Sequence, residues 1–172
     1  MTDTRHADID LRHLHRAVEL ALAAERAGNL PIGAVITLGA EIIAEAGNAV
    51  LQPHYHPGRH AEIEALRLVP AALWPRAREL TCYTTLEPCV MCGGALLLHG
   101  VGRVVFGASD PEGGASVLLE NLPPYYADES LVPAWTGPLL PDQCEPLYER
   151  LRAQFDVLPC GKHGQEWTRK KE

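Results

Sequence analysis

The amino-acid sequence predicts an α/β fold in which a sheet lies between helices. Apolar runs at helical spacing alternate along the chain with short β-prone runs, and this alternation is typical of α/β domains. The 172 residues suit a single domain, and the 47% hydrophobic composition is sufficient to fill one core. We therefore expect one domain over residues 1–158 and a C-terminal tail over residues 159–172 that is either flexible or a lid.

Residues typical of helix ends and turns delimit the first helix and the hairpin that follows it. The helical pattern of leucines and alanines stops at Gly28 and Asn29, two residue types that suit a helix end. Gly39 and Ala40 then separate two β-prone runs, which is the usual mark of a hairpin. Residues 52–59 contain two prolines and a glycine, so we expect a loop that leads into the second helix.

The second half of the chain continues with strands and helices in alternation. A β-prone run ends at Leu86, and an apolar helical run follows Pro88. Pro88 is predicted as the first residue of that helix because proline has a suitable φ and lacks only an amide hydrogen without a helical partner. Glu87 is predicted to cap the same helix. In all, the sequence predicts helices over residues 9–27, 60–69, 88–99, 116–121 and 141–155, and strands over residues 32–38, 41–50, 80–86, 103–106 and 131–135.

Charge and cysteine content limit the classes of partner. The formal net charge is −7, and residues 107–149 contain no lysine or arginine. This counts against a broad nucleic-acid footprint and favours a small neutral substrate.

No apolar run approaches the roughly 20 residues that span a bilayer, so we expect no membrane anchor. Five cysteines, two of them three apart, favour metal ligation in a reducing cytoplasm over a disulfide framework.

Two separated motifs predict a metal-assisted reaction. His60-Ala61-Glu62 stands at one predicted helix start, and Cys89 and Cys92 stand at another. Cysteines at i and i+3 share one side of a first helical turn, where the helix dipole favours thiolates. With His60 as third ligand, a zinc ion keeps one position for water, as catalytic sites do. Glu62 would take a proton from that water, pass it to the substrate and later protonate the leaving group.

The cysteine pair also allows other interpretations. A structural zinc site would take Cys82, His54 or His56 as a fourth ligand, and the chain would then be a non-catalytic binding or assembly module. A redox role suits the cysteine spacing too, but it leaves the histidine of the other motif unused. Cys82 is otherwise interpreted as a small core residue, and Cys144 and Cys160 have no predicted role.

The chain resembles the zinc deaminases of the cytidine-deaminase-like superfamily and, within it, most of all the tRNA adenosine deaminases. The resemblance rests on residues 30–35, 42–48, 60–67, 84–92 and 102–108, which are most of the segment from 30 to 116. It implies a three-layer α/β/α sandwich with a five-stranded mixed sheet, and a homodimer. It also implies Zn²⁺ as cofactor and hydrolytic removal of an exocyclic amine from a nucleobase.

The same resemblance assigns roles to individual residues. It gives the metal to His60, Cys89 and Cys92, proton transfer to Glu62, and substrate contacts to Asn48, Ala61 and Ile32. By its type alone, Asn48 would suit a turn instead of a substrate contact. Trp167 in the tail is a candidate aromatic lid over the pocket, with a disordered tail as the alternative.

Departures from the family pattern leave two substrate classes open. Residues 55–59 replace the Asp-Pro-Thr that usually precedes His-Ala-Glu, and residues 123–126 stand where tRNA enzymes carry a histidine- and asparagine-containing loop. The C-terminal tail also contains fewer basic residues than the family pattern leads one to expect. The motifs favour adenosine-to-inosine conversion in tRNA, whereas the acidic charge favours a free base or nucleoside of guanine, cytosine or adenine.

Overall fold

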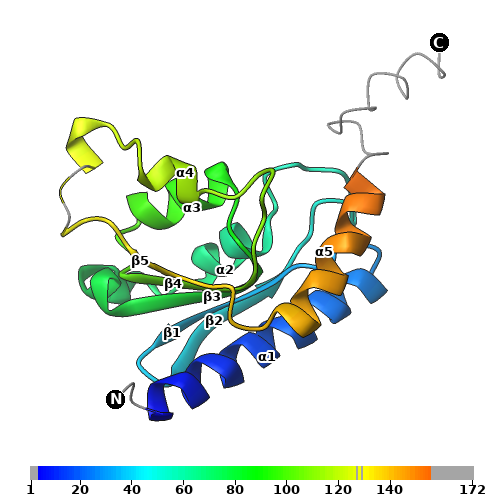
Figure 1. The fold of residues 1–172 in the computed structure, drawn as a ribbon, viewed down its shortest axis with the longest axis horizontal. Helices are drawn as coiled ribbons and strands as arrows, with labels where there is room; N and C mark the ends of the chain where they lie inside the picture. Colours follow the sequence, from blue (N-terminus) through cyan, green and yellow to red (C-terminus); the bar gives the residue numbers. More distant parts are fainter. Residues whose placement is uncertain (1–3, 127, 129, 156–172) are drawn as a thin grey trace.

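A five-stranded mixed sheet with helices on both faces forms the domain (Figure 1), in a computed structural model that describes residues 4–126, 128 and 130–155. The strands are β1 (Gly33–Leu38), β2 (Glu41–Gly47), β3 (Leu80–Leu86), β4 (Arg103–Ala108) and β5 (Ala134–Thr136). The α-helices are α1 (Thr4–Arg26), α2 (Ala61–Leu68), α3 (Val90–Leu98), α4 (Ser116–Leu119) and α5 (Pro141–Phe155), and two 3-10 helices are η1 (Ala71–Glu79) and η2 (Pro124–Tyr126). The predicted α/β/α sandwich with a five-stranded mixed sheet is confirmed.

The sheet combines an antiparallel half with a parallel half. Its strand order is β2-β1-β3-β4-β5. Strand β1 pairs antiparallel with β2 and β3, whereas β4 pairs parallel with β3 and β5. The β1–β2 turn contains Gly39 at φ +59°, a conformation that glycine adopts without a Cβ penalty. Because β3 and β4 are parallel, the segments that follow them both leave the same edge of the sheet.

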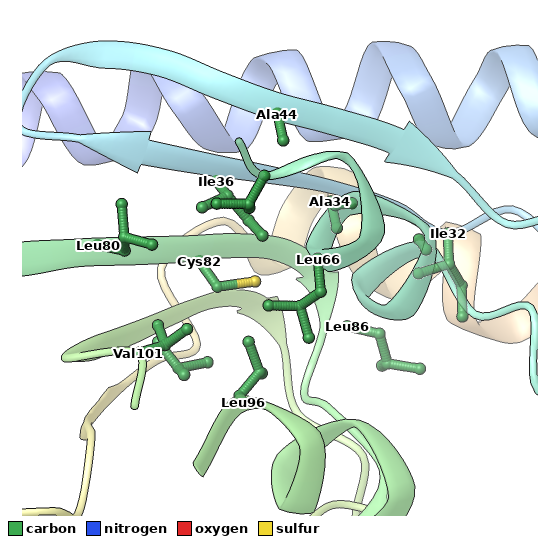
Figure 2. Close-up of a cluster of buried hydrophobic side chains, with 14 of the residues drawn as sticks. Ile32, Ala34, Ile36, Ala44, Leu66, Leu80, Cys82, Leu86, Leu96 and Val101 are labelled. Atoms are coloured by element: carbon green, nitrogen blue, oxygen red, sulfur yellow. The ribbon is translucent and has the colours of Figure 1, made fainter. Parts of the chain in front are cut away.

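Side chains alternate between the two faces of the central strands and form two core clusters. Val35 and Tyr83 pack against α1, in a cluster with Leu14, Ala17 and Val105. On the opposite face Ile36 and Cys82 pack with Leu66 of α2 and Leu96 of α3, as Figure 2 shows. Helices α1 and α5 therefore cover one face of the sheet, and α2 and α3 cover the other.

The predicted bounds are correct for β3 and α5, and the bounds of the other elements differ from the prediction at one or both ends. Helix α1 begins at residue 4 instead of 9, β2 ends at residue 47 instead of 50, α4 ends at residue 119 instead of 121 and β4 continues to residue 108 instead of 106, while β1, α2 and the end of α1 differ by one residue. Helix α3 begins at Val90, so Pro88 is not its first residue; Cys89 is extended (ψ 172°) and forms a β-bridge with Gly114, which delays the helix. Strand β5 begins at residue 134 because Pro133 cannot donate a ladder hydrogen bond. The 3-10 helix η1 was not predicted.

Among the described residues, no helix combines the length and apolar character required to cross a membrane. The tail over residues 159–172, including Cys160 and Trp167, lies outside the described residues. The four described cysteines, Cys82, Cys89, Cys92 and Cys144, are all free thiols.

Candidate active site

A cavity of about 300 Å³ lies at the edge of the sheet where the carboxyl ends of β3 and β4 meet. This volume is at the small end of the range for ligand pockets. Its buried end is lined by Ile32, Asn48, His60, Glu62 and Cys89. Its more exposed end is lined by Asp110, Glu112, Tyr148 and Arg152. The cavity therefore joins the two predicted motifs to a second set of residues that the motifs do not contain.

The three predicted metal ligands converge at two helix starts. His60 is the N-cap of α2 and Cys89 is the N-cap of α3, while Cys92 lies in the first turn of α3. Nδ1 of His60 is 3.6 Å from the Cys89 sulfur and 3.5 Å from the Cys92 sulfur. In the described part of the chain, these three residues alone form a group whose donor atoms all lie within 4.8 Å of one another. His54, His56 and Cys82 do not join it.

The pKa values of the two thiols shift in opposite directions. A hydrogen bond from Cys92, helped by His60 and opposed by burial, lowers the pKa of Cys89 to about 4. The bond to Cys89, burial and the charge of Glu62 raise the pKa of Cys92 above its ordinary value. Burial lowers the pKa of His60, but the bond to Cys89 and the charge of Glu62 outweigh it and leave that pKa raised. The lowered pKa of Cys89 favours its thiolate, the form of cysteine that binds metals.

Glu62 is buried beside this cluster, with 3% of its surface exposed. The hydroxyl of Thr84 donates a hydrogen bond of 3.0 Å to Oε1 of Glu62, and the Cys92 thiol lies 3.4 Å from Oε2. Burial raises the pKa of Glu62, although the positive charge of His60 opposes the shift. A carboxylate that readily takes up a proton is suited to act as a base and then as an acid.

Asn48 combines a local role with an unused donor. Its Oδ1 accepts a hydrogen bond of 3.0 Å from the amide of Val50, which is the turn role expected of an asparagine. Its Nδ2 is buried and has no partner within the described structure, although Asn48 lines the cavity. Leaving a buried donor unsatisfied costs about 1–3 kcal/mol. Ile32 also lines the cavity, whereas Ala61 is buried without lining it.

Glu87 organises the cavity wall and does not cap α3. Its carboxylate accepts hydrogen bonds of 3.2 Å from the backbone amides of Asp110 and Ser116. A Cβ on Gly114 would lie 2.5 Å from Cδ of Glu87, so only glycine allows this close approach. The carboxylate thus joins the segment that carries Cys89 to the loop between β4 and α4.

The exposed end of the cavity was not predicted from the sequence. Asp110 and Glu112 belong to the loop after β4, and Tyr148 and Arg152 belong to α5. Residues 107–114 contain three glycines directly after a strand, and this local signal of a loop at the sheet edge was available. Nothing in the sequence relates α5 to the two motifs, because their proximity is a tertiary contact.

Three comparisons with known proteins all find deaminases. The family model of MafB19-like deaminases matches residues 9–124. A tRNA-specific adenosine deaminase from Bacillus subtilis (strain 168) is 44% identical over 115 residues, which are 66% of this chain and 70% of that protein. A probable cytosine deaminase from Schizosaccharomyces pombe is 30% identical over 166 residues, covering 80% of this chain and 99% of that protein.

A solved structure from work on A-to-I editing by tRNA:A34 deaminases at the wobble position superposes with a TM-score of 0.65. It is 29% identical in sequence, and the match covers 80% of this chain and 99% of that one. The family model spans more than half of the chain, and the fold and the convergent motifs agree with it. The chain therefore belongs to the MafB19-like deaminases of the cytidine-deaminase-like superfamily and is a hydrolytic deaminase.

Proposed function

We propose that the enzyme uses zinc held by His60, Cys89 and Cys92 to convert adenosine to inosine in tRNA. The observation that carries the zinc assignment is the spacing of the donor atoms. A tetrahedral zinc with Zn–N of about 2.05 Å and Zn–S of about 2.3 Å separates nitrogen from sulfur by about 3.6 Å. The two sulfurs lie 3.6 and 3.5 Å from Nδ1 of His60. Three donors also leave one position for a water molecule.

The surrounding residues support a proton-transfer role for Glu62. When bound, zinc supplies Lewis-acid activation of water. Glu62 would accept one proton of that water and deliver it to a ring nitrogen of the base as the hydroxyl adds to the amino-bearing carbon. It would then take the proton of the added hydroxyl and deliver it to the amine, which leaves as ammonia when the C–N bond breaks. Thr84 holds one oxygen of Glu62, so the other oxygen faces Cys92 and the metal position. Burial of the carboxylate makes its protonated state accessible during the reaction.

The base would be held between apolar walls and one directed donor. Leu30, Ile32, Leu86 and Leu151 contribute the apolar part of the cavity lining. The free Nδ2 of Asn48 can donate to a nitrogen or oxygen acceptor on the edge of the base. Ala61, the first residue of α2, is the further predicted contact. Such a slot suits a flat heterocycle that has been taken out of its stack.

The choice of tRNA adenosine is supported by the similarity to the Bacillus subtilis enzyme and to the tRNA:A34 deaminase structure. The test is the formation of inosine in an anticodon stem-loop by the zinc-loaded enzyme, with Glu62→Gln as control. The variant should keep its zinc and lose turnover, because the ligands remain while the proton carrier is gone. Turnover by Glu62→Gln would contradict the mechanism.

A second candidate is deamination of a free base. The match to the probable cytosine deaminase extends over 80% of this chain, farther than the 66% matched by the adenosine enzyme, and the chain is acidic. Release of ammonia from cytosine, guanine or adenine, with no inosine formed in the stem-loop, would favour this candidate. The membership of a deaminase family decides against a non-catalytic zinc module.

We also propose a homodimer formed through α3. This nine-residue helix has no charged side chain, and Val90, Met91 and Leu98 are 60%, 40% and 67% exposed. A helix that is apolar on all sides is normally buried. Sedimentation should therefore report a dimer, and Leu98→Lys should shift it toward the monomer. A wild-type monomer at working concentration would contradict this proposal.

Two further proposals concern the tail and the compartment. Residues 159–172 would act as a tail outside the catalytic domain, with Trp167 as an aromatic lid over the base. Trp167→Ala should then raise KM more than it lowers kcat, and an unchanged KM would exclude the lid. The free thiols of the described cysteines suit the reducing conditions of a cytoplasm.

A further inference from the structure

The exposed end of the cavity contains a single guanidinium, that of Arg152 in α5. Apart from His60 in the metal cluster, no other basic side chain lines the cavity in the described part of the chain. Its charged neighbours there are the carboxylates of Asp110 and Glu112. On a protein with a formal net charge of −7, Arg152 is the cation that an anionic group entering this cavity would meet.

Arg152 is held in a defined orientation by contacts on two sides. Its Nη2 lies 2.7 Å from Oε1 of Glu112, and its guanidinium lies over the ring of Tyr148, 5.8 Å from the centroid. The Tyr148 hydroxyl in turn donates a hydrogen bond of 2.8 Å to Oδ1 of Asp110. Arg152 therefore lies in the cavity wall between the carboxylate of Glu112 and the ring of Tyr148.

The partner carboxylate can be exchanged at low cost. The side chains of Arg152 and Glu112 are 50% and 48% exposed, and exposed ion pairs contribute about 0–1 kcal/mol. A guanidinium presents the same fork of donors to a carboxylate and to a phosphate. A phosphodiester with two acceptor oxygens can thus replace Glu112 without any change in the backbone.

We propose that Arg152 binds a backbone phosphate next to the target nucleotide, and that Glu112 occupies the guanidinium until this phosphate replaces it. This inference rests on the proposed function, because only a nucleotide within a nucleic acid carries a flanking phosphodiester. Glu112 then acts as an internal competitor. A neutral base gains nothing from displacing it, whereas an RNA strand does, so the pair favours RNA over free bases.

The experiment measures inosine formation in an anticodon stem-loop at several salt concentrations with the zinc-loaded enzyme. The variants are Arg152→Gln, Glu112→Gln and the control Arg150→Gln. Arg150 lies on the same helix and is similarly exposed, but it pairs with Glu25 of α1 and does not line the cavity. Zinc content and the circular dichroism spectrum of each variant verify that it is folded.

Arg152→Gln should raise KM for the stem-loop about fivefold to tenfold and reduce the slope of log KM against log salt by about 0.7, the loss of one single-stranded phosphate contact. Glu112→Gln should lower KM, because the guanidinium is no longer occupied by a carboxylate. Arg150→Gln should change neither quantity. Because KM should rise in Arg152→Gln and fall in Glu112→Gln, the two variants distinguish phosphate binding from a general loss of structure.

Two results would overturn the inference in different ways. If wild type forms inosine but Arg152→Gln and Glu112→Gln have the same KM and salt slope as Arg150→Gln, Arg152 binds no phosphate and the proposed function remains. If wild type releases ammonia from a free base and forms no inosine in the stem-loop, the proposed function is wrong and the phosphate site is excluded with it.

Discussion

Thr84 donates a hydrogen bond of 3.0 Å to the buried carboxylate of Glu62, and this bond joins the proposed proton-transfer residue to the centre of the sheet. Thr84 itself is fully buried in β3, between β1 and β4. The side chain of Glu62, at the start of α2, is therefore held in place by a residue of the central strand β3. One oxygen of Glu62 is fixed, and the other is left to face the cysteines.

Replacing Thr84 by valine should lower kcat about tenfold or more and leave the zinc content unchanged. Valine has nearly the same shape but no hydroxyl, and a hydrogen bond to a charged group contributes about 1.5–3 kcal/mol. Steady-state kinetics and metal analysis measure both quantities. Thr84→Ser keeps the donor and should retain most of the activity. Equal activity of the valine and serine variants would show that the bond does not orient Glu62.

Asn48→Asp should lower kcat/KM about 10- to 100-fold while the protein remains folded. The aspartate keeps an oxygen for the Val50 amide but presents a second oxygen where Nδ2 was. The expected loss of kcat/KM thus comes from the substrate contact alone, which contributes about 1–3 kcal/mol. Asn48→Ala removes both interactions and should also lower the thermal midpoint. An aspartate variant with wild-type KM would contradict a contact from Asn48 to the base.

Alanine substitutions at the two adjacent glycines of α3 should change the stability of the fold in opposite directions. A Cβ on Gly93 would lie 2.6 Å from Cβ of Ala115, whereas a Cβ on Gly94 meets no atom within 4 Å. Gly93→Ala should therefore destabilise the fold by about 1–3 kcal/mol through overpacking. Gly94→Ala should stabilise the helix by about 0.5–1 kcal/mol. Chemical denaturation of the zinc-loaded variants measures both, and a destabilising Gly94→Ala would indicate that another surface packs on this position.

Stability should decrease below about pH 6.5 because of His13. This side chain is 2% exposed, and its ring centroid lies 4.9 Å from that of Tyr83 with the two rings tilted by 43°. Its Nε2 has no partner within the described structure. Burial and the charge of Arg12 lower its pKa below the ordinary value of 6.5, although Asp10 opposes the shift. As the pH falls through 6.5, the unfolded chain binds a proton that the folded chain does not bind. The folded state then loses up to about 1.4 kcal/mol per pH unit until the lowered pKa is reached.

Unfolding free energies of wild type and His13→Phe between pH 8 and pH 5 measure this contribution. Phenylalanine fills similar space and has no titrating group, so the difference between the two curves should be constant above pH 7 and should change in favour of the variant below pH 6.5. Parallel curves over the whole range would assign the pH dependence to other groups.

The sequence predicted elements well where the local signal and the tertiary structure agree. Strand β3 and helix α5 have their predicted bounds, since strong apolar patterns end there at clear breaks. The start of α3 could not be predicted, because the extended conformation of Cys89 depends on a bridge to Gly114, a residue 25 positions away. Strand β5 was placed too early, although Pro133 gave a usable signal.

The cluster of candidate metal ligands was predictable for a different reason. His60, Cys89 and Cys92 are chemically rare residues at a recognisable spacing, and the fold brings them within 4.8 Å of one another. Tyr148 and Arg152 are of common residue types on an amphipathic helix, and only the packing of α5 against β4 brings them to the cavity. Chemistry that depends on a motif can be predicted from a sequence, whereas a cavity wall that depends on packing cannot.

The carboxylate of Glu87 accepts hydrogen bonds from the backbone amide of Asp110, in the loop after β4, and from that of Ser116, the first residue of α4. Any residue except proline offers the same amide at these two positions. The loop can therefore exchange Glu112 for another side chain and remain in place beside the proposed metal ligands, whereas Asp110 is needed because its Oδ1 accepts hydrogen bonds from the amides of Glu112 and Gly113. Selection for a new substrate can act on this loop while the catalytic centre stays as it is, which gives the scaffold a way to diversify without a loss of chemistry.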